Sequence, residues 1–125
     1  MADMFDDIKK FHEKFKLEYN GEPRYLPIDL AKFRYTFMSE ELEEYRIARR
    51  NSDLSGQLDA LVDLVYVALG TAYMQGFDFD EAWRRVHEAN MKKIKAPSKD
   101  ASKRGSEYDV VKPVGWVPPY LKDLA

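Results

Sequence analysis

Cysteine is absent from the 125 residues, and histidine occurs only twice, at His12 and His87. The chain can therefore form neither disulfide bonds nor thiolate metal sites, which fits a reducing compartment. Any metal site must rely mainly on aspartate and glutamate. Ligands of this kind favour a hard cation, Mg²⁺ or Mn²⁺.

A large charge excess and long apolar runs are also missing. The 20 basic and 22 acidic residues leave a formal charge of −2, so we expect no nucleic-acid partner. The longest apolar stretch, residues 61–71, is too short to span a bilayer and is interrupted by Asp63. The acidic first residues also lack the apolar segment of a signal peptide. These features predict a cytoplasmic protein without membrane contact.

Apolar residues at helical spacing predict an all-α fold. The expected helices cover residues 4–17, 28–50, 53–75 and 78–93. Short connections favour antiparallel packing in a bundle of four to five helices, completed by oligomerisation. We expect residues 1–96 to form a helical catalytic domain. Residues 97–125 should form an irregular tail, with a short hairpin around residues 108–111, that packs on the domain or on a partner subunit.

Three of the expected helices have a defined apolar face. Asp29 is the expected N-cap of the second helix, Asn51-Ser52-Asp53 should supply caps for the third, and Gly76 should end the third. The third helix is apolar nearly all round between residues 61 and 69, so we expect it to be buried between neighbours. The expected apolar faces comprise Phe5, Ile8, Phe11 and Phe15; Leu30, Phe33 and Phe37; and Leu54, Leu58, Leu61, Val62, Val65 and Leu69.

Carboxylates interrupt these apolar faces. On the second helix the face runs into Glu40 or Glu41 and then Glu44, in steps of three or four residues. On the third helix, Asp59 and Asp63 are four residues apart, and Asp63 lies inside the apolar run 61–65. An ionised carboxylate there is costly to bury unless positive charge compensates it.

The crowding of these acids predicts a metal site. Like charges on two packed helices raise each other's pKa or require a cation between them. The alternative is that residues 40–44 form a solvated run of charge. That alternative does not explain why Asp63 lies among branched apolar residues.

Two segments resemble the characteristic helices of the all-α NTP pyrophosphohydrolases. They are residues 40–45 (EELEEY) and 59–66 (DALVDLVY). This superfamily includes MazG-like enzymes, phosphoribosyl-ATP pyrophosphohydrolase and dimeric dUTPases. Its pattern is Glu-x-x-Glu followed, one helix later, by an acid-x-x-Asp pair. Glu41 and Glu44 match the first pair, and Asp63 matches the last Asp.

Further segments resemble the phosphoribosyl-ATP pyrophosphohydrolase-like branch. They are Phe11-His12, Arg34, residues 86–93 (VHEANMKK) and residues 116–119 (WVPP). The resemblance implies hydrolysis of an NTP or dNTP between the α and β phosphates, to a monophosphate and pyrophosphate. It also implies a homodimer or homotetramer with a small-molecule nucleotide as substrate.

The resemblance also suggests roles for individual residues. Mg²⁺, or Mn²⁺ in its place, would be held by Glu41, Glu44, Asp63 and either Glu40 or Asp59. It would neutralise the phosphates and make a bound water more acidic. Glu40 or Glu41 could be the general base.

Three more residues are candidates for substrate binding. Asn90 and Lys93 would contact phosphate or sugar, although a Lys at that position also suits a helix C-terminus through the dipole. Arg34 could reach phosphate or pair with a Glu of its own helix. His12 and His87 fit core or surface positions better than catalytic ones.

The chain departs from the family pattern at one position. Many members carry Glu three residues before the last Asp, where this chain has Ala60. Asp59 is the candidate replacement, because residues four apart share a helix face.

Two other classes of helical protein could carry a similar set of acidic residues. A non-catalytic helical interaction protein would bear the same acids as a solvated surface. A di-iron bundle needs two Glu-x-x-His pairs, and neither histidine has Glu three residues before it.

Overall fold

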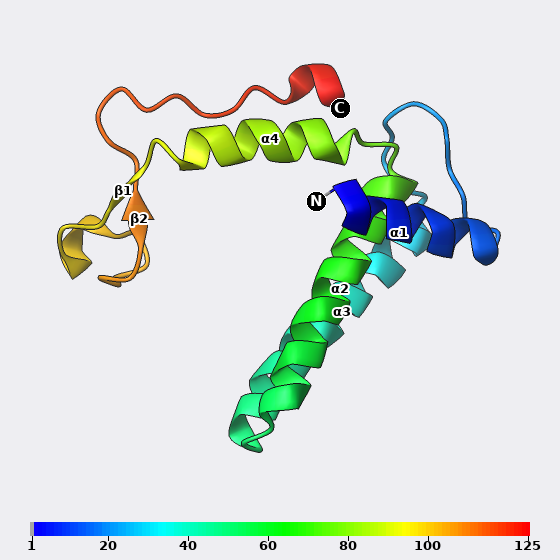
Figure 1. The fold of residues 1–125 in the computed structure, drawn as a ribbon, viewed down its shortest axis with the longest axis horizontal. Coiled ribbons are helices and arrows are strands. Elements are labelled where there is room, and N and C mark those ends of the chain that lie inside the picture. The colour runs from blue at the N-terminus through cyan, green and yellow to red at the C-terminus, as the bar shows by residue number, and fades with distance from the viewer. Residues whose placement is uncertain (1) are drawn as a thin grey trace. The chain divides into compact units, whose positions relative to one another are not determined.

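The computed structural model describes residues 2–125, and helices dominate this part of the chain. Figure 1 shows the order of the elements. The helices are α1 (Ala2–Lys14), α2 (Ile28–Arg50), α3 (Leu54–Met74) and α4 (Phe79–Asn90). Two-residue strands β1 (Ile94–Lys95) and β2 (Val110–Val111) and the 3-10 helices η1 (Lys99–Ala101) and η2 (Lys122–Leu124) follow. This confirms the all-α prediction with an irregular C-terminal region, and α4 ends three residues earlier than expected.

The described chain forms two compact units, residues 1–79 with Ala125 and residues 80–124. The division lies at the first residue of α4, whereas the predicted domain boundary lies after the helix, between residues 96 and 97. Assignment of residues 1–96 as a catalytic domain stays a prediction. No single helix in the described residues is long and apolar enough to cross a membrane, although α3 and α4 taken together as a broken pair reach that length and composition.

The core of the first unit lies where α1 packs against α3. Phe5 and Ile8 of α1 are buried, as predicted, and His12 continues the same face at 2% exposure. Phe5 stacks on Phe79 with ring centroids 5.9 Å apart. On α3 the core residues are Leu69, Ala72, Tyr73 and Met74.

Two aromatic side chains of α1 differ from expectation. Phe11 and Phe15 are 40% and 53% exposed, so the expected stripe through them is wrong. Burial follows residues 5, 8 and 12 instead. Phe15 lies beyond the end of α1 at Lys14, where the chain turns through Lys16 with φ of 57°.

The start of α2 and the start of α3 are capped differently. Asp53 accepts a hydrogen bond from the Gly56 backbone N–H at 2.9 Å and caps α3, as predicted. The prediction that Asp29 caps α2 is wrong. Pro27 holds the N-cap position, and Asp29 lies in the first turn, where its charge suits the helix dipole.

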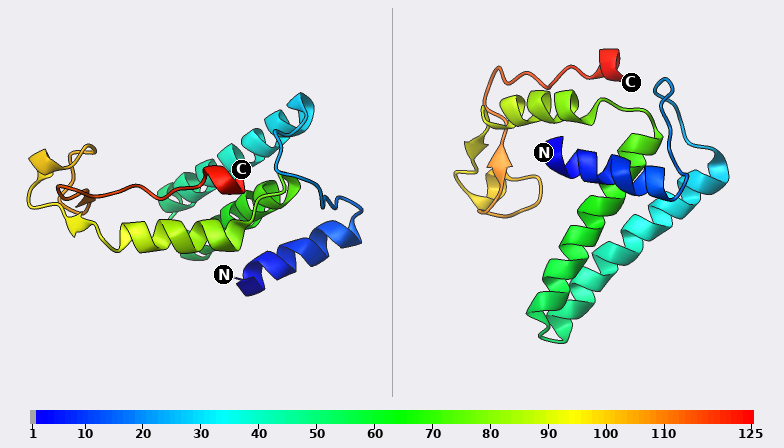
Figure 2. Two further views of the ribbon diagram at one scale, coloured as in Figure 1. Left: turned by 90° about the horizontal axis from the view of Figure 1, so that it is seen from above. Right: turned by 45° about the vertical axis from the view of Figure 1, so that its right-hand side comes forward.

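Helices α2 and α3 lie side by side as an antiparallel hairpin (Figure 2). The three buried residues of α2 are seven positions apart, as in a coiled coil, and three of the seven buried residues of α3 have the same spacing. We call these residues the α2–α3 seam: Arg34, Glu41 and Ala48 on α2, and Ala60, Val67 and Met74 on α3. Two of the three α2 positions therefore bury a charged side chain, which is costly unless each finds a partner.

Arg34 has its partners on α3. Its Nε donates to Thr71 Oγ1 at 3.1 Å, and its Nη2 donates to the Val67 carbonyl at 2.9 Å. A Cβ on Gly70 would lie 2.6 Å from Arg34 Nη2 and 2.8 Å from His12 Nε2. A larger residue at position 70 would therefore displace both buried polar side chains.

Gly70→Ala is expected to lower the free energy of unfolding by about 1–3 kcal/mol, because overpacking would force the two buried side chains apart. Urea denaturation followed by circular dichroism measures this change. Lys32→Ala is the control, because it also introduces Ala into a helix but at an exposed position of α2. An equal loss in both variants would contradict the proposed role of the close approach.

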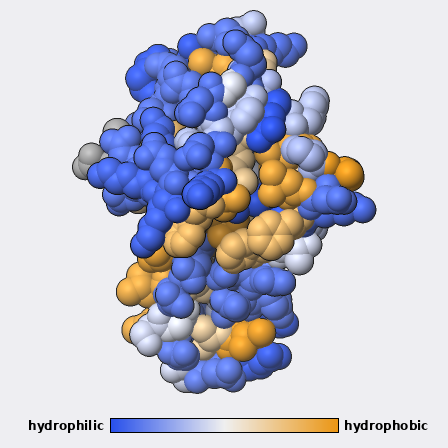
Figure 3. All heavy atoms as spheres, turned by 90° about the vertical axis from the view of Figure 1, so that its right-hand side faces the viewer, coloured by the Kyte–Doolittle hydropathy of each residue, from blue (hydrophilic) through white to orange (hydrophobic). Residues whose placement is uncertain are grey.

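The face of α3 that points away from the α2–α3 seam is more exposed than predicted. Leu54, Leu58, Leu61, Val62 and Val65 are between 43% and 81% exposed, so they are not buried within one chain as predicted. The physical reason is the length of α1, which covers only the C-terminal half of this face, around Leu69 and Tyr73. Apolar side chains are visible at the surface in Figure 3. We call the exposed stripe the bare face of α3.

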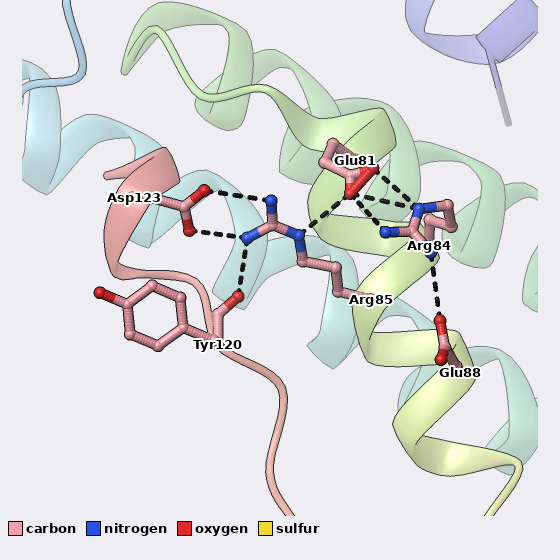
Figure 4. A network of polar contacts seen from close by, with 6 residues as sticks. All are labelled: Glu81, Arg84, Arg85, Glu88, Tyr120 and Asp123. Atoms are coloured by element: carbon pink, nitrogen blue, oxygen red, sulfur yellow. Dashed lines mark hydrogen bonds and ion pairs between the residues drawn. The ribbon is translucent and has the colours of Figure 1, made fainter.

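In the second unit, hydrogen bonds and an ion pair join the tail to α4 (Figure 4). Arg85 donates to Asp123 Oδ1 at 2.6 Å and to the Tyr120 carbonyl at 2.9 Å. Trp116 Nε1 donates to the Ala89 carbonyl at 2.7 Å. The short hairpin expected around residues 108–111 is wrong, because Val110–Val111 forms strand β2, which pairs antiparallel with β1 at Ile94–Lys95.

Candidate functional site

The candidate site is built on the α2–α3 seam around Glu41. Its side chain is 7% exposed, and its Oε2 has no hydrogen-bond partner in the described chain. Burial raises the pKa of Glu41 to about 7, helped by a hydrogen bond with Glu44 and by the negative charges of Glu44, Asp63 and Asp59. Four of the predicted carboxylates are therefore close enough to act on one another.

Asp63 shows the same effect from the α3 side. Burial raises its pKa, and the charges of Asp59 and Glu44 add to the increase. Asp59 acts on Asp63 more than Glu44 does, as expected for carboxylates one turn apart on a single helix. The acids of both helices thus face each other, as the sequence predicts.

Glu40 differs from these four residues. Its side chain is exposed, and it does not contribute to the raised pKa of Glu41 or Asp63. Within the described part of the chain, no three carboxylate or histidine side chains converge with metal-site geometry. The ligand set therefore stays a prediction.

The residues present fit a divalent cation chemically. A buried carboxylate oxygen without a partner is costly, and a cation would compensate it. All the donors are carboxylate oxygens, which Mg²⁺ and Mn²⁺ prefer. Ala60, the position at which the resemblance predicts Glu, is 2% exposed and lies inside the seam.

The three predicted substrate-binding residues lie in different surroundings. Arg34 belongs to the seam, where the α3 groups described above satisfy two of its nitrogens. Asn90 is exposed at the end of α4. Lys93 is half-buried, with Nζ 5.2 Å from the centroid of the Trp116 ring. Their contacts with substrate stay a prediction.

The family model for phosphoribosyl-ATP pyrophosphohydrolase matches residues 8–90. The chain belongs to the phosphoribosyl-ATP pyrophosphohydrolase family. It is thereby a pyrophosphohydrolase, a hydrolase acting on acid anhydrides, within the all-α NTP pyrophosphohydrolase superfamily. Enzymes of this family typically depend on Mg²⁺. No curated protein matches the sequence.

The matched region contains all the predicted carboxylates, Arg34 and Asn90. It ends before Lys93 and before the whole C-terminal tail. Two features of this family member were not predicted from its sequence. One is the close approach of His12 and Arg34 to Gly70. The other is the basic cluster of the tail, which includes Lys103, Arg104 and Lys112.

Signals for both features are present in the sequence. The seven-residue spacing of Arg34, Glu41 and Ala48 indicates that Arg34 shares the buried seam with Glu41. Between positions 92 and 112, seven basic residues outnumber three acidic ones, Asp100, Glu107 and Asp109. Pairing of the tail with α4 through Trp116 has no local sequence signal.

Proposed function

We propose that this family member hydrolyses the α–β phosphate bond of an NTP or dNTP to the monophosphate and pyrophosphate. The observation that carries the proposal is Glu41, a buried carboxylate with an unpartnered oxygen among three other acids. Phosphoribosyl-ATP, the substrate in the family's name, is itself a nucleotide and belongs to the proposed substrate class.

The proposed ligands of a divalent cation are Glu41, Glu44, Asp63 and Asp59, with Glu40 as a further candidate. When bound, the cation would supply Lewis acidity toward phosphate and water. These carboxylates come from two packed helices, α2 and α3, and the raised pKa values of Glu41 and Asp63 support their holding one cation together. A non-catalytic interaction protein has no need of a buried Glu41 whose Oε2 finds no hydrogen-bond partner in the described chain.

Proton transfer in the proposed reaction falls to a carboxylate. Water adds to the α-phosphorus and the bond from the α-phosphorus to the bridging oxygen breaks. Pyrophosphate leaves with the electron pair of that bond. Glu40 or Glu41 accepts the proton from water. Asn90 and Lys93 would hold phosphate or sugar, and the Lys93 ammonium would stabilise developing negative charge.

A nucleotide panel tests the proposal directly. The eight common NTPs and dNTPs and phosphoribosyl-ATP would be incubated with the enzyme and Mg²⁺ or Mn²⁺, and the products identified by anion-exchange chromatography. At least one substrate should give monophosphate and pyrophosphate. Diphosphate with orthophosphate, or full activity in excess EDTA, would overturn the proposal.

Asp59→Asn is expected to raise the Mg²⁺ concentration for half-maximal activity by about tenfold, with partial recovery at high Mg²⁺, because one charged ligand would be lost. A Mg²⁺ titration of turnover measures this shift. Asp53→Asn keeps a helix cap at the start of α3 and serves as the control. Superimposable titration curves for Asp59→Asn and the unchanged protein would show that Asp59 is not a ligand.

We further propose that the active form is a homodimer or homotetramer. The bare face of α3 continues the face that packs against α1, yet it is exposed in one chain. The same face of a second copy would complete a bundle around the two hairpins.

A further inference from the structure

The C-terminal unit contains a basic cleft of which the proposed reaction uses only Lys93. The cleft has a volume of about 360 Å³ and lies between the end of α4 and the β1–β2 hairpin. Its charged lining residues are Lys93, Lys103, Arg104, Asp109 and Lys112. Residues 91–125 lie outside the family match, so membership of the family does not account for the cleft.

The single acidic side chain of the lining is already engaged. Asp109 Oδ2 accepts hydrogen bonds from Ser102 Oγ at 2.7 Å and from Arg104 Nη1 at 2.8 Å. Its Oδ1 accepts from the Val110 backbone N–H at 2.9 Å. These bonds hold the pKa of Asp109 below its usual value. Its negative charge is already compensated by Arg104 and by the hydrogen bonds of the loop.

The three lysines of the cleft have no such compensation. Within the described residues, no ion pair neutralises Lys93, Lys103 or Lys112. Lys93 and Lys112 both lie against Trp116, with Nζ 5.2 Å and 5.1 Å from the ring centroid. The indole N–H of Trp116 is hydrogen-bonded to the Ala89 carbonyl, so the ring is held in place. Two ammonium groups of like charge therefore lie close to the same ring.

A larger cleft in the same unit differs in its charge balance. It has a volume of about 610 Å³ and contains Arg84 and Arg85. Both arginines are paired with acids: Arg84 with Glu81 and Glu88, and Arg85 with Glu81 and Asp123 (Figure 4). Within the described residues, that cleft retains one lysine without an ion pair, Lys92, whereas the smaller one offers three uncompensated ammonium groups.

We propose that the cleft lined by Lys93, Lys103 and Lys112 binds an oligophosphate anion, a chain of two or three phosphates. Such an anion carries several negative charges over a length that suits separate point charges, which is how lysine recognises phosphate. Its source is either free pyrophosphate or triphosphate, or the phosphate chain of a nucleotide. The proposal concerns anion binding without metal and stands whether or not the protein hydrolyses the nucleotides of the panel.

Calorimetric titration with sodium tripolyphosphate in EDTA at low ionic strength tests the proposal. The unchanged protein should bind the anion. Lys103→Gln/Lys112→Gln should bind about tenfold or more weakly, because two charged contacts are lost. Lys99→Gln/Lys122→Gln removes the same charge from exposed positions outside the cleft, and its affinity should stay within about twofold of the unchanged protein.

Two further measurements keep the result specific. Lys103→Arg/Lys112→Arg retains the charge and should retain binding, and circular dichroism should show that all variants are folded. If the unchanged protein does not bind tripolyphosphate, or if both Gln double variants weaken binding equally, the proposal is overturned.

Kinetics with a nucleotide that the protein hydrolyses would separate the two sources. A raised KM with unchanged kcat in Lys103→Gln/Lys112→Gln would place the nucleotide's own phosphate chain in the cleft. An unchanged KM together with lost tripolyphosphate binding would identify a site for the free anion. Either result supports the cleft as an oligophosphate site.

Discussion

Glu41→Gln and Asp63→Asn are each expected to lower turnover by about a thousandfold or more, equivalent to about 4 kcal/mol in the activation barrier. Each substitution keeps the size of the side chain and removes a negative charge from the carboxylate cluster. Steady-state release of pyrophosphate at saturating Mg²⁺ measures the loss. Glu43→Gln is the matched control, because Glu43 is an exposed residue of α2 that pairs with Arg46.

The same variants are expected to keep or raise the melting temperature of the metal-free protein. Glu41 is buried beside Glu44, Asp63 and Asp59, so removal of its charge relieves repulsion and desolvation together. Differential scanning calorimetry in EDTA measures this effect. If Asp63→Asn unfolds the protein, then Asp63 is a structural hydrogen-bonding group and the interpretation of the cluster is wrong.

The pH dependence of stability gives a separate check on Glu41. Its pKa is raised to about 7 in the folded chain, above the ordinary value of 4.5, so the folded state binds more protons between these values. The stabilising contribution is complete below pH 4.5 and is lost as the pH rises through 7. The metal-free protein should therefore lose stability between pH 5 and 8 more steeply than Glu41→Gln does, and parallel curves would contradict the raised pKa.

His12 acts in the opposite direction. Burial lowers its pKa, and the charge of Arg34 lowers it further. The folded state then binds fewer protons than the unfolded state, and stability is lost as the pH falls below the ordinary value of 6.5. Comparison of unchanged and Glu41→Gln protein removes this common contribution.

Sequence reasoning predicted the helices well because their signals are local. The bounds of α2 are those expected, and the cap at Asp53 follows from side-chain chemistry within three residues. The meeting of Glu41, Glu44, Asp59 and Asp63 was also predictable, since two antiparallel helices with acids on their packed faces must bring them together. The raised pKa values of Glu41 and Asp63 agree with that interpretation.

The failures have a common physical cause in the limits of periodicity. A helical stripe says which residues share a face, and it does not say how far a neighbouring helix covers that face. Phe11 and Phe15 share a face near Phe5 and Ile8, but the core follows His12. Likewise, α1 is too short to cover Leu58 and Val65, although their spacing is that of a buried helix. Non-local pairings such as Trp116 with Ala89 leave no periodic trace at all.

The bare face of α3 is expected to form the interface between two copies of the chain. Leu54, Leu58, Leu61 and Val65 recur at steps of four, three and four residues, which is the spacing that packs against another helix. Leu58 is 65% exposed and Val65 is 43% exposed in one chain. An apolar stripe of this length on a small domain favours association with a second copy of the same face.

Leu58→Gln/Val65→Gln is therefore expected to weaken self-association by about a hundredfold or more, since each side chain contributes about 1.5–3 kcal/mol when buried. Analytical ultracentrifugation from 0.1 to 100 μM, a range of about a thousandfold around common dissociation constants, measures the change. Tyr25→Gln/Ile28→Gln is the control, because these residues are 96% and 70% exposed and lie outside α3. The melting temperature of the unchanged protein should also rise with concentration, because association stabilises the folded chain. A stable monomer at micromolar concentration would rule out assembly through α3, and an equal effect of the control pair would place the interface elsewhere.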